Sequence, residues 1–116
     1  MEILVVRRGS FTMAPLEGES GDFALNDAFG KAEGAPFSFG MWEIRPSEDP
    51  VVTETANDCV AQYVLEGSVE AEIDGRVWRV AAGDFLFIPK VPDKEVTWRV
   101  TSGVFRAIYV TYPHWE

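Results

Sequence analysis

The sequence of 116 residues contains one cysteine, Cys59, and one histidine, His114. A single cysteine excludes a disulfide within the chain, so we expect a reducing compartment, the cytoplasm. A single histidine leaves little imidazole for a metal centre or for acid–base chemistry. His114 lies in the tail 112–116, where an isolated histidine is typically solvated.

Positive charge is also scarce, since 10 Lys and Arg stand against 19 Asp and Glu, for a net charge of −9. Such a surface repels phosphate backbones and anionic lipid, which excludes nucleic-acid and membrane partners. No segment approaches the ~20 apolar residues of a membrane helix. The apolar N-terminal residues precede the first arginines, the reverse of a signal peptide.

The length predicts one domain, and a hydrophobic content of 47% supplies its core. Residues 1–36 are expected to form an N-terminal strand at Ile3–Val6 followed by an irregular arm. We expect this arm to wrap the domain and to be held by its phenylalanines, with one helical turn near Leu25–Phe29. Residues 37–116 are expected to form the body of the domain.

The chain after residue 36 contains eight short segments that are rich in β-branched and aromatic residues and are separated by turn residues. Glu66-Gly67 and Asp74-Gly75 are tight-turn signals, and the second is typical of a hairpin. Many short strands at regular spacing predict an all-β sandwich or barrel. The predicted strands are Phe37–Arg45, Val51–Thr55, Cys59–Leu65, Ser68–Ile73, Arg76–Val80, Phe85–Ile88, Lys94–Val100 and Val104–Thr111.

Alternation along these strands singles out two polar residues. Lys94 is in phase with the apolar Val96 and Trp98, at the end of a face predicted to be buried. Gln62 is the strongly polar residue of Cys59–Leu65, a segment that is otherwise apolar on both faces. A buried amide needs hydrogen-bond partners, because leaving it unpaired costs about 1–3 kcal/mol.

Three segments, 63–67, 73–75 and 83–89, resemble the cupin superfamily, because Leu-Glu-Gly is followed by Ile-Asp-Gly and then by Gly-Asp, an apolar run and Ile-Pro. The resemblance is closest to the small cupins grouped with the ethanolamine-utilisation Q-type proteins (DUF861). It implies a double-stranded β-helix, an RmlC-like jelly-roll barrel. It also implies a homodimer that forms through strands near the N-terminus.

The same resemblance locates the positions at which metal-binding cupins carry three histidines and a glutamate. Here they are occupied by Val60, by Lys94 and by residues within Thr53–Ala56. Valine cannot bind a metal, and lysine arrives as a cation. We therefore expect no metal and no other cofactor, which argues against metal-dependent dioxygenase and oxalate-decarboxylase activities.

The mouth of the barrel is where this fold usually holds a ligand. Trp42 and Trp98 could stack on a ligand or pack in the core, and Gln62 could bind a ligand or satisfy a neighbouring strand. Lys94 could reach water at the rim, or, if it is buried, could form with Glu54 a pair for proton transfer. The candidate residues are Trp42, Gln62, Trp98 and Tyr109 for binding and Lys94 and Glu54 for catalysis.

Three functions are compatible with these residues. The first is a metal-free protein that binds a small polar metabolite in the barrel. The second is a metal-independent isomerase, epimerase or lyase that uses Lys94. The third is a structural or assembly protein, in which apolar surface becomes an interface. The sequence does not decide whether the protein is an enzyme, and it does not name the ligand.

Overall fold

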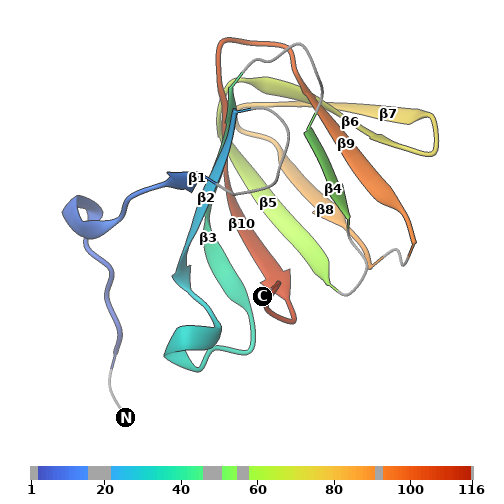
Figure 1. The fold of residues 1–116 in the computed structure, drawn as a ribbon. Coiled ribbons are helices and arrows are strands. Elements are labelled where there is room, and N and C mark those ends of the chain that lie inside the picture. Colours follow the sequence, from blue (N-terminus) through green and yellow to red (C-terminus); the bar gives the residue numbers. More distant parts are fainter. Residues whose placement is uncertain (1–2, 16–21, 46–50, 55–57, 91–92, 116) are drawn as a thin grey trace.

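The computed structural model describes residues 3–15, 22–45, 51–54, 58–90 and 93–115, with the backbone alone for residues 15, 22 and 51–54. In these residues the chain forms ten strands, and its helical segments are two short 3-10 turns, Arg8–Ser10 and Lys31–Glu33 (Figure 1). No helix among them is long and apolar enough to cross a membrane. The protein is therefore all-β in its described part.

The strands form two sheets. The larger has the order β1-β2-β3-β10-β5-β8, and the smaller has the order β4-β9-β6-β7. All pairings are antiparallel. The larger sheet consists of β1 (Ala14–Pro15), β2 (Asp22–Phe29), β3 (Ser38–Arg45), β10 (Phe105–Tyr112), β5 (Cys59–Glu66) and β8 (Phe85–Ile88). The smaller consists of β4 (Val51–Glu54), β9 (Glu95–Val100), β6 (Ser68–Ile73) and β7 (Arg76–Ala81).

The two sheets face each other, lie close together at one end and diverge at the other, where β10 ends (Figure 1). Chain neighbours such as β5 and β6 lie in different sheets, as in a jelly roll. The predicted fold class, a jelly-roll cupin barrel, is confirmed. Each of the eight strands predicted after residue 36 is present, and Ser68–Ile73 and Phe85–Ile88 have the predicted ends.

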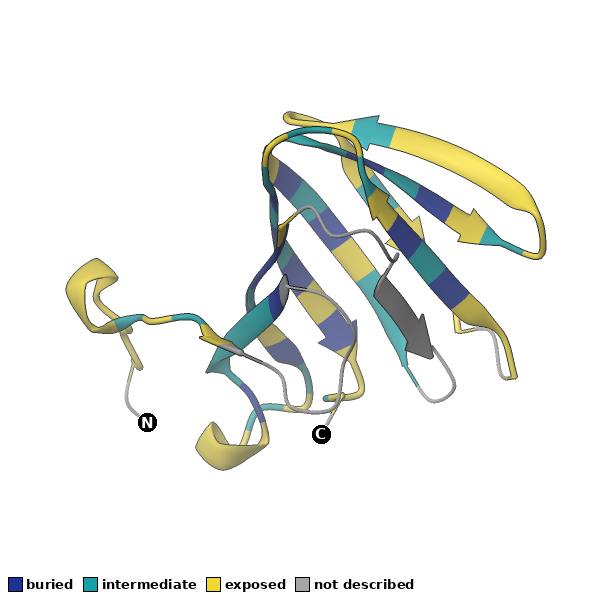
Figure 2. Ribbon diagram, turned by 45° about the horizontal axis from the view of Figure 1, so that its top comes forward, coloured by how far each residue is buried: buried dark blue, intermediate teal, exposed yellow. Residues whose placement is uncertain are grey.

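Every second side chain along the central strands points between the sheets, and these side chains form the core. Buried and exposed residues alternate along the central strands (Figure 2). Phe105, Ile44, Val64, Val69 and Val96 are completely enclosed. These side chains come from both sheets, so removing them from water holds the two layers together.

The turn between β5 and β6 requires a glycine. Gly67 has a φ of +80°, in the left-handed region that side chains with a Cβ rarely adopt. A Cβ at this position would lie 1.8 Å from the carbonyl oxygen of Val104. The Glu66-Gly67 signal in the sequence therefore has two physical causes, the backbone conformation and the close approach of the loop before β10.

The N-terminal region differs from the prediction. Residues 22–29 form strand β2, not a helical turn near Leu25–Phe29, because Phe23 is buried and Leu25 packs against the core in a period of two. Ile3–Val6 forms no strand and is exposed. The described segment before β1 projects away from the sheets and does not wrap them (Figure 1).

Candidate functional site

Trp42 lies at the centre of an aromatic cluster between the sheets. Its ring makes edge contacts with Phe23, Trp98 and Phe105, at centroid distances of 5.2, 4.9 and 5.7 Å. Its indole Nε1 donates a hydrogen bond of 2.7 Å to Oε1 of Gln62. The structure thus brings together three predicted site residues, Trp42, Gln62 and Trp98. Trp42 and Gln62 are joined by this hydrogen bond, and the rings of Trp42 and Trp98 pack together in the interior.

A row of polar groups crosses the inner face of the larger sheet next to this cluster. Tyr109 pairs in register with Gln62 on one side and with Gly40 on the other, and Gly40 pairs with Asp27. Direct cross-strand partners share a face, so these residues belong to the inner face. The Tyr109 hydroxyl donates a hydrogen bond to the carboxylate of Asp27.

Gly40 determines where Asp27 lies. A Cβ on Gly40 would lie 2.1 Å from the carbonyl oxygen of Asn26, so only glycine allows β2 to come this close. The β2–β3 register shifts between Asp27 and Phe29, as at a β-bulge, which typically redirects a side chain. Sequence reasoning missed Asp27, and the glycine within Phe37–Arg45 was the available signal.

The tail of the chain is attached to this row. The indole Nε1 of Trp115 lies 3.0 and 3.1 Å from the two carboxylate oxygens of Asp27. The Trp115 backbone N–H donates to Oγ of the buried Ser38 at 3.1 Å, and the Thr111 hydroxyl donates to the carbonyl oxygen of Pro113 at 3.0 Å. His114 Nδ1 is buried and has no hydrogen-bond partner among the described residues.

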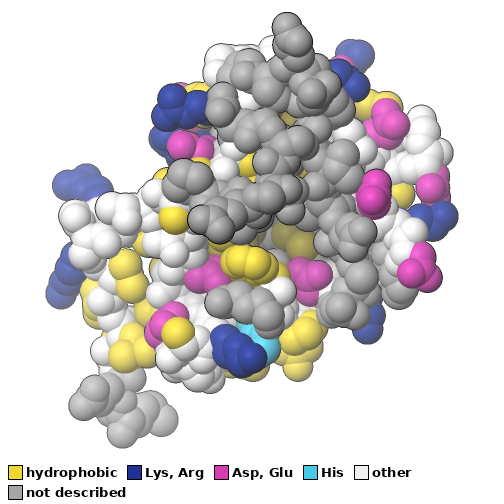
Figure 3. All heavy atoms as spheres, in the orientation of Figure 1, with side chains coloured by type: hydrophobic (Ala, Val, Ile, Leu, Met, Phe, Trp, Pro, Cys, Tyr) yellow, Lys and Arg dark blue, Asp and Glu magenta, His cyan; other side chains and the backbone are white. Residues whose placement is uncertain are grey.

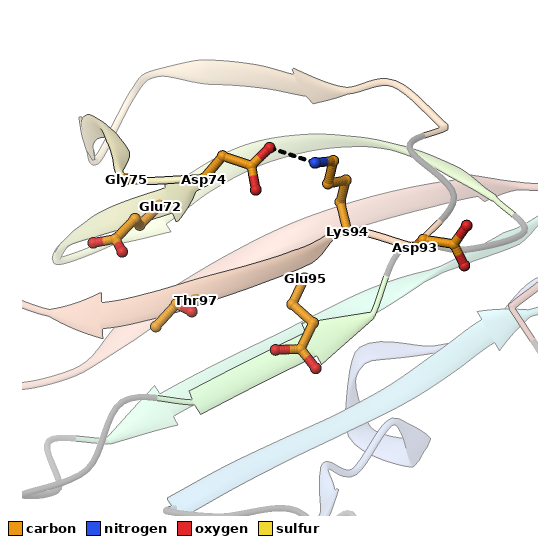
Figure 4. A pocket seen from close by; sticks show the side chains of 7 residues that line it. All are labelled: Glu72, Asp74, Gly75, Asp93, Lys94, Glu95 and Thr97. Atoms are coloured by element: carbon orange, nitrogen blue, oxygen red, sulfur yellow. Dashed lines mark ion pairs between the residues drawn. The ribbon is translucent and has the colours of Figure 1, made fainter.

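Lys94 belongs to a different part of the molecule. Its ammonium lies 2.7 Å from Oδ2 of Asp74 at the β6–β7 turn, and 44% of its side chain is exposed (Figure 4). It is therefore a rim lysine. The predicted partner Glu54 pairs in register with Glu95, and its side chain lies outside the described residues. Asp74 is thus the carboxylate that the structure places beside Lys94.

An open pocket of about 610 Å³ surrounds the Lys94–Asp74 pair. Acidic side chains gather on this side of the molecule, over β6, β7 and β9 (Figure 3). The hydrogen bond and charge of Asp74 raise the pKa of Lys94, and the charge of Asp93 adds to this. The ammonium therefore stays protonated at neutral pH, which is unfavourable for a general base. The pocket is lined by Glu72, Asp74, Gly75, Asp93, Lys94, Glu95 and Thr97.

Two of the family's metal positions, Val60 and Lys94, carry residues that do not fit a transition metal. Val60 packs against the hydrophobic core, and the Lys94 ammonium is held by Asp74. Thr55 and Ala56 lie outside the described residues. In the described ranges, no three His, Cys, Asp or Glu side chains gather in a way that could hold a metal ion. An aliphatic group and an ammonium offer no lone pair to such an ion.

The two facing antiparallel sheets and the inward polar row define a cupin barrel. Residues 31–109 match the family described as the EutQ-like cupin domain, and this chain belongs to that family. The acetate kinase EutQ of Clostridioides difficile (strain 630) is 32% identical over 87 residues. That match covers 75% of this chain and 52% of the relative, so the chain spans about half the length of the curated relative.

Solved structures show the same architecture. The EutQ protein of Clostridium difficile superposes with a TM-score of 0.75 at 25% identity, over 95% of this chain and 80% of that chain. The ethanolamine utilisation protein Q of Salmonella typhimurium LT2 superposes with a TM-score of 0.76 at 24% identity, over 94% and 85%. The family expected from the sequence is confirmed.

Proposed function

We propose that this chain is a metal-independent cupin that binds a small polar metabolite at the Asp27–Tyr109 pair. One observation carries the proposal: the Asp27 carboxylate on the inner face accepts hydrogen bonds from two aromatic side chains, Tyr109 and Trp115. A carboxylate so placed offers a charged hydrogen-bond acceptor on the inner face of the larger sheet. Few, well-placed polar groups beside an apolar wall are typical of small-molecule sites.

The chemistry of Asp27 selects the ligand class. An ionised carboxylate only accepts hydrogen bonds, so the ligand must present N–H or O–H donors and gains most from an ammonium group. Trp115 is exposed and follows β10 by only a few residues, so a ligand donor can take the place of its indole N–H. The buried Nδ1 of His114, the residue before Trp115, is a second group that a ligand could satisfy.

Metal independence is part of the proposal. It is supported by the chemistry of Val60 and Lys94, which replace two of the metal-binding positions. The aromatic cluster supports it as well, because Trp42 and Gln62 complete each other's hydrogen bond without an ion. A metal-sized mass increment that survives buffer exchange in native mass spectrometry of the purified protein would contradict this part.

Ethanolamine and acetate are the probes that test the ligand class. The names of the relatives refer to ethanolamine utilisation and acetate kinase, and ethanolamine and acetate differ in whether they carry hydrogen-bond donors. Ethanolamine has an ammonium and a hydroxyl donor, whereas acetate has only acceptors and is repelled by Asp27. Ligand-observed NMR should therefore detect ethanolamine binding and no acetate binding at this site.

The variant Asp27→Asn should weaken ethanolamine binding at least tenfold, because a charged hydrogen bond contributes about 1.5–3 kcal/mol. Asp74→Asn is the matched control, since it makes the same chemical change in the separate pocket around Lys94. Equal losses in both variants would show that general acidity, not Asp27, attracts the amine. Acetate binding at this site in the wild type would contradict the proposed ligand class.

Acetate kinase activity is a second candidate, favoured by the name of the 32% identical relative. Phosphoryl transfer needs cationic groups around the transferred phosphate. In the described pocket the cation is Lys94, which Asp74 neutralises. A coupled assay with ATP, Mg²⁺ and acetate tests this activity directly. Turnover abolished by Lys94→Ala would favour a kinase over a binding protein.

A further inference from the structure

The segment before β1 carries two arginines that no acidic residue accompanies. In residues 3–16, Arg7 and Arg8 are the charged side chains, in a chain with a net charge of −9. Both are exposed, and the segment projects away from the sheets (Figure 1). Neither guanidinium forms an ion pair with a described residue, whereas those of Arg79 and Arg106 do. Two neighbouring guanidinium groups are therefore available to a partner.

A serine follows this pair, with one glycine between them. Ser10 is the hydroxyl residue of the sequence that has two arginines among the three residues before it. Its hydroxyl donates a hydrogen bond of 2.9 Å to the carbonyl oxygen of Arg7, and its backbone N–H donates to the same oxygen at 3.0 Å. These bonds close the 3-10 turn Arg8–Ser10, which buries no residue. A single solvated turn opens easily, so the hydroxyl is accessible to an enzyme.

The chain is fixed to the sheet just after this serine. The side-chain amide of Asn26 on β2 donates a hydrogen bond of 2.7 Å to the carbonyl oxygen of Thr12, and β1 begins at Ala14. Ser10 lies two residues outside the first of these attachments. An enzyme can therefore take residues 3–10 into a groove without separating any strand, as is typical of exposed chain ends that are modified or cleaved.

The chemistry of the segment indicates the enzyme that would act on it. Protein kinases select substrates partly by charge pattern, and carboxylates bind guanidinium groups through paired, charge-assisted hydrogen bonds. An acidic groove would attract Arg7 and Arg8 and would repel the acidic remainder of the chain. We infer that Ser10 is phosphorylated by a serine kinase whose substrate groove is acidic. This modification site is separate from the ligand site at Asp27 and does not depend on it.

The reaction transfers the terminal phosphoryl group of a nucleoside triphosphate. The hydroxyl oxygen of Ser10 bonds to the terminal phosphorus, the bond from that phosphorus to the bridging oxygen breaks, and the diphosphate leaves. The hydroxyl proton goes to the general base of the kinase. The product carries a charge of about −1.5 to −2 beside Arg7 and Arg8, so it cancels the positive charge of the segment and can form new charge-assisted hydrogen bonds with both.

Incubation of the full chain with ATP, Mg²⁺ and a serine kinase that selects basic substrates tests the inference, with mass spectrometry of the intact protein and of its peptides. The wild type should gain a phosphate on Ser10, and Ser10→Ala should gain none. A kinase that selects acidic substrates is the matched enzyme control and should leave Ser10 unmodified. No phosphate on Ser10, or equal labelling by both kinases, overturns the inference.

Arginine variants test whether the pair directs the kinase. Arg7→Gln with Arg8→Gln should slow phosphorylation at least about tenfold, because both charged hydrogen-bond donors are lost. Arg76→Gln with Arg79→Gln is the matched control, since it removes the same charge from exposed side chains of β7 and should leave the rate unchanged. Equal slowing of the two double variants, with unchanged circular dichroism, would show that net charge alone matters and would overturn recognition of the segment.

Phosphorus NMR of the modified protein tests whether the arginines hold the phosphate. The second pKa of a free phosphoserine is about 6, and neighbouring guanidinium groups should lower it, by an amount that shrinks as salt is added. A second pKa at or above about 6 would show that they do not hold it. Protein isolated from its own cells under several growth conditions should carry phosphate on Ser10 in part of the molecules. Its absence under all of them would overturn a cellular role.

Discussion

The indole Nε1 of Trp115 lies 3.0 and 3.1 Å from the two carboxylate oxygens of Asp27, which is 88 residues earlier in the chain. The same carboxylate accepts the hydroxyl of Tyr109 on β10. One acidic side chain on β2 is thereby joined both to the centre of the larger sheet and to the tail that follows β10. The tail is held where the proposed ligand would bind, so ligand and tail compete for Asp27.

Trp115→Phe should strengthen ethanolamine binding several-fold, because the phenyl ring has no N–H donor and leaves Asp27 available. The same change removes hydrogen bonds to a charged group and should cost about 1.5–3 kcal/mol of stability at most. Titration by NMR and urea unfolding measure the two effects. Weaker binding in Trp115→Phe would show that the tryptophan is part of the ligand site, not its competitor.

Gln62→Leu should destabilise the protein by about 1–3 kcal/mol, because it leaves the buried indole N–H of Trp42 without its acceptor. Trp42→Phe removes the donor and some ring volume. The double variant should cost less than the sum of the two single variants, by about 1 kcal/mol or more, because neither partner is then left unpaired. Urea unfolding of the four proteins gives this coupling. Strict additivity would mean that the 2.7 Å contact contributes nothing.

Gly67→Ala should destabilise the fold strongly, by about 3 kcal/mol or more, because strain at a positive φ adds to a clash with the loop before β10. Gly75 is a matched control, with a φ of +82° and no atom within 4 Å of the position that a Cβ would take. Gly75→Ala should cost only about 1–2 kcal/mol, the penalty of the left-handed conformation alone. Similar melting temperatures for the two variants would show that the contact with Val104 is relaxed at no cost.

Burial raises the pKa of Asp58 above its ordinary value of 3.8, and the hydrogen bond to its own backbone opposes this only in part. The folded state therefore holds the proton more tightly than the unfolded state, and ionisation disfavours folding. The contribution of Asp58 to the free energy of unfolding should fall as the pH rises from 3.8 through the raised pKa of Asp58 in the folded state. Asp58→Asn should remove this part of the pH dependence and should be slightly more stable than wild type at neutral pH. Melting temperatures of the wild type and of Asp58→Asn between about pH 3 and 7 measure both effects. If the two melting temperatures differ by the same amount at every pH, the prediction is contradicted.

The strands after residue 36 could be predicted because the information is local. An apolar period of two and turn glycines such as Gly67 fix where each strand begins and ends. The prediction failed at residues 22–29, where small and polar residues between Phe23 and Phe29 weaken the pattern. That segment is a strand because it pairs with β3, and a partner so placed is not visible in the local sequence.

The candidate site could be predicted only in part. Trp42, Gln62 and Trp98 were expected to lie together, and they do, but as a closed cluster. Lys94 was expected in phase with Trp98, but β9 begins at Glu95, and Asp93 has a φ of +64°, so the alternation stops before residue 94. Of the two positions that the sequence left open for Lys94, the structure shows the one at the rim.

The sequence alone determined the all-β class, the positions of the later strands and the family, because hydrophobic period, turn glycines and motif spacing are properties of neighbouring residues. Tertiary structure alone decided which strands are neighbours, and with that the meeting of Asp27, Tyr109 and Trp115. The physical reason is that β-sheet contacts join residues far apart in the chain, so a site on one face exists only once the register is set.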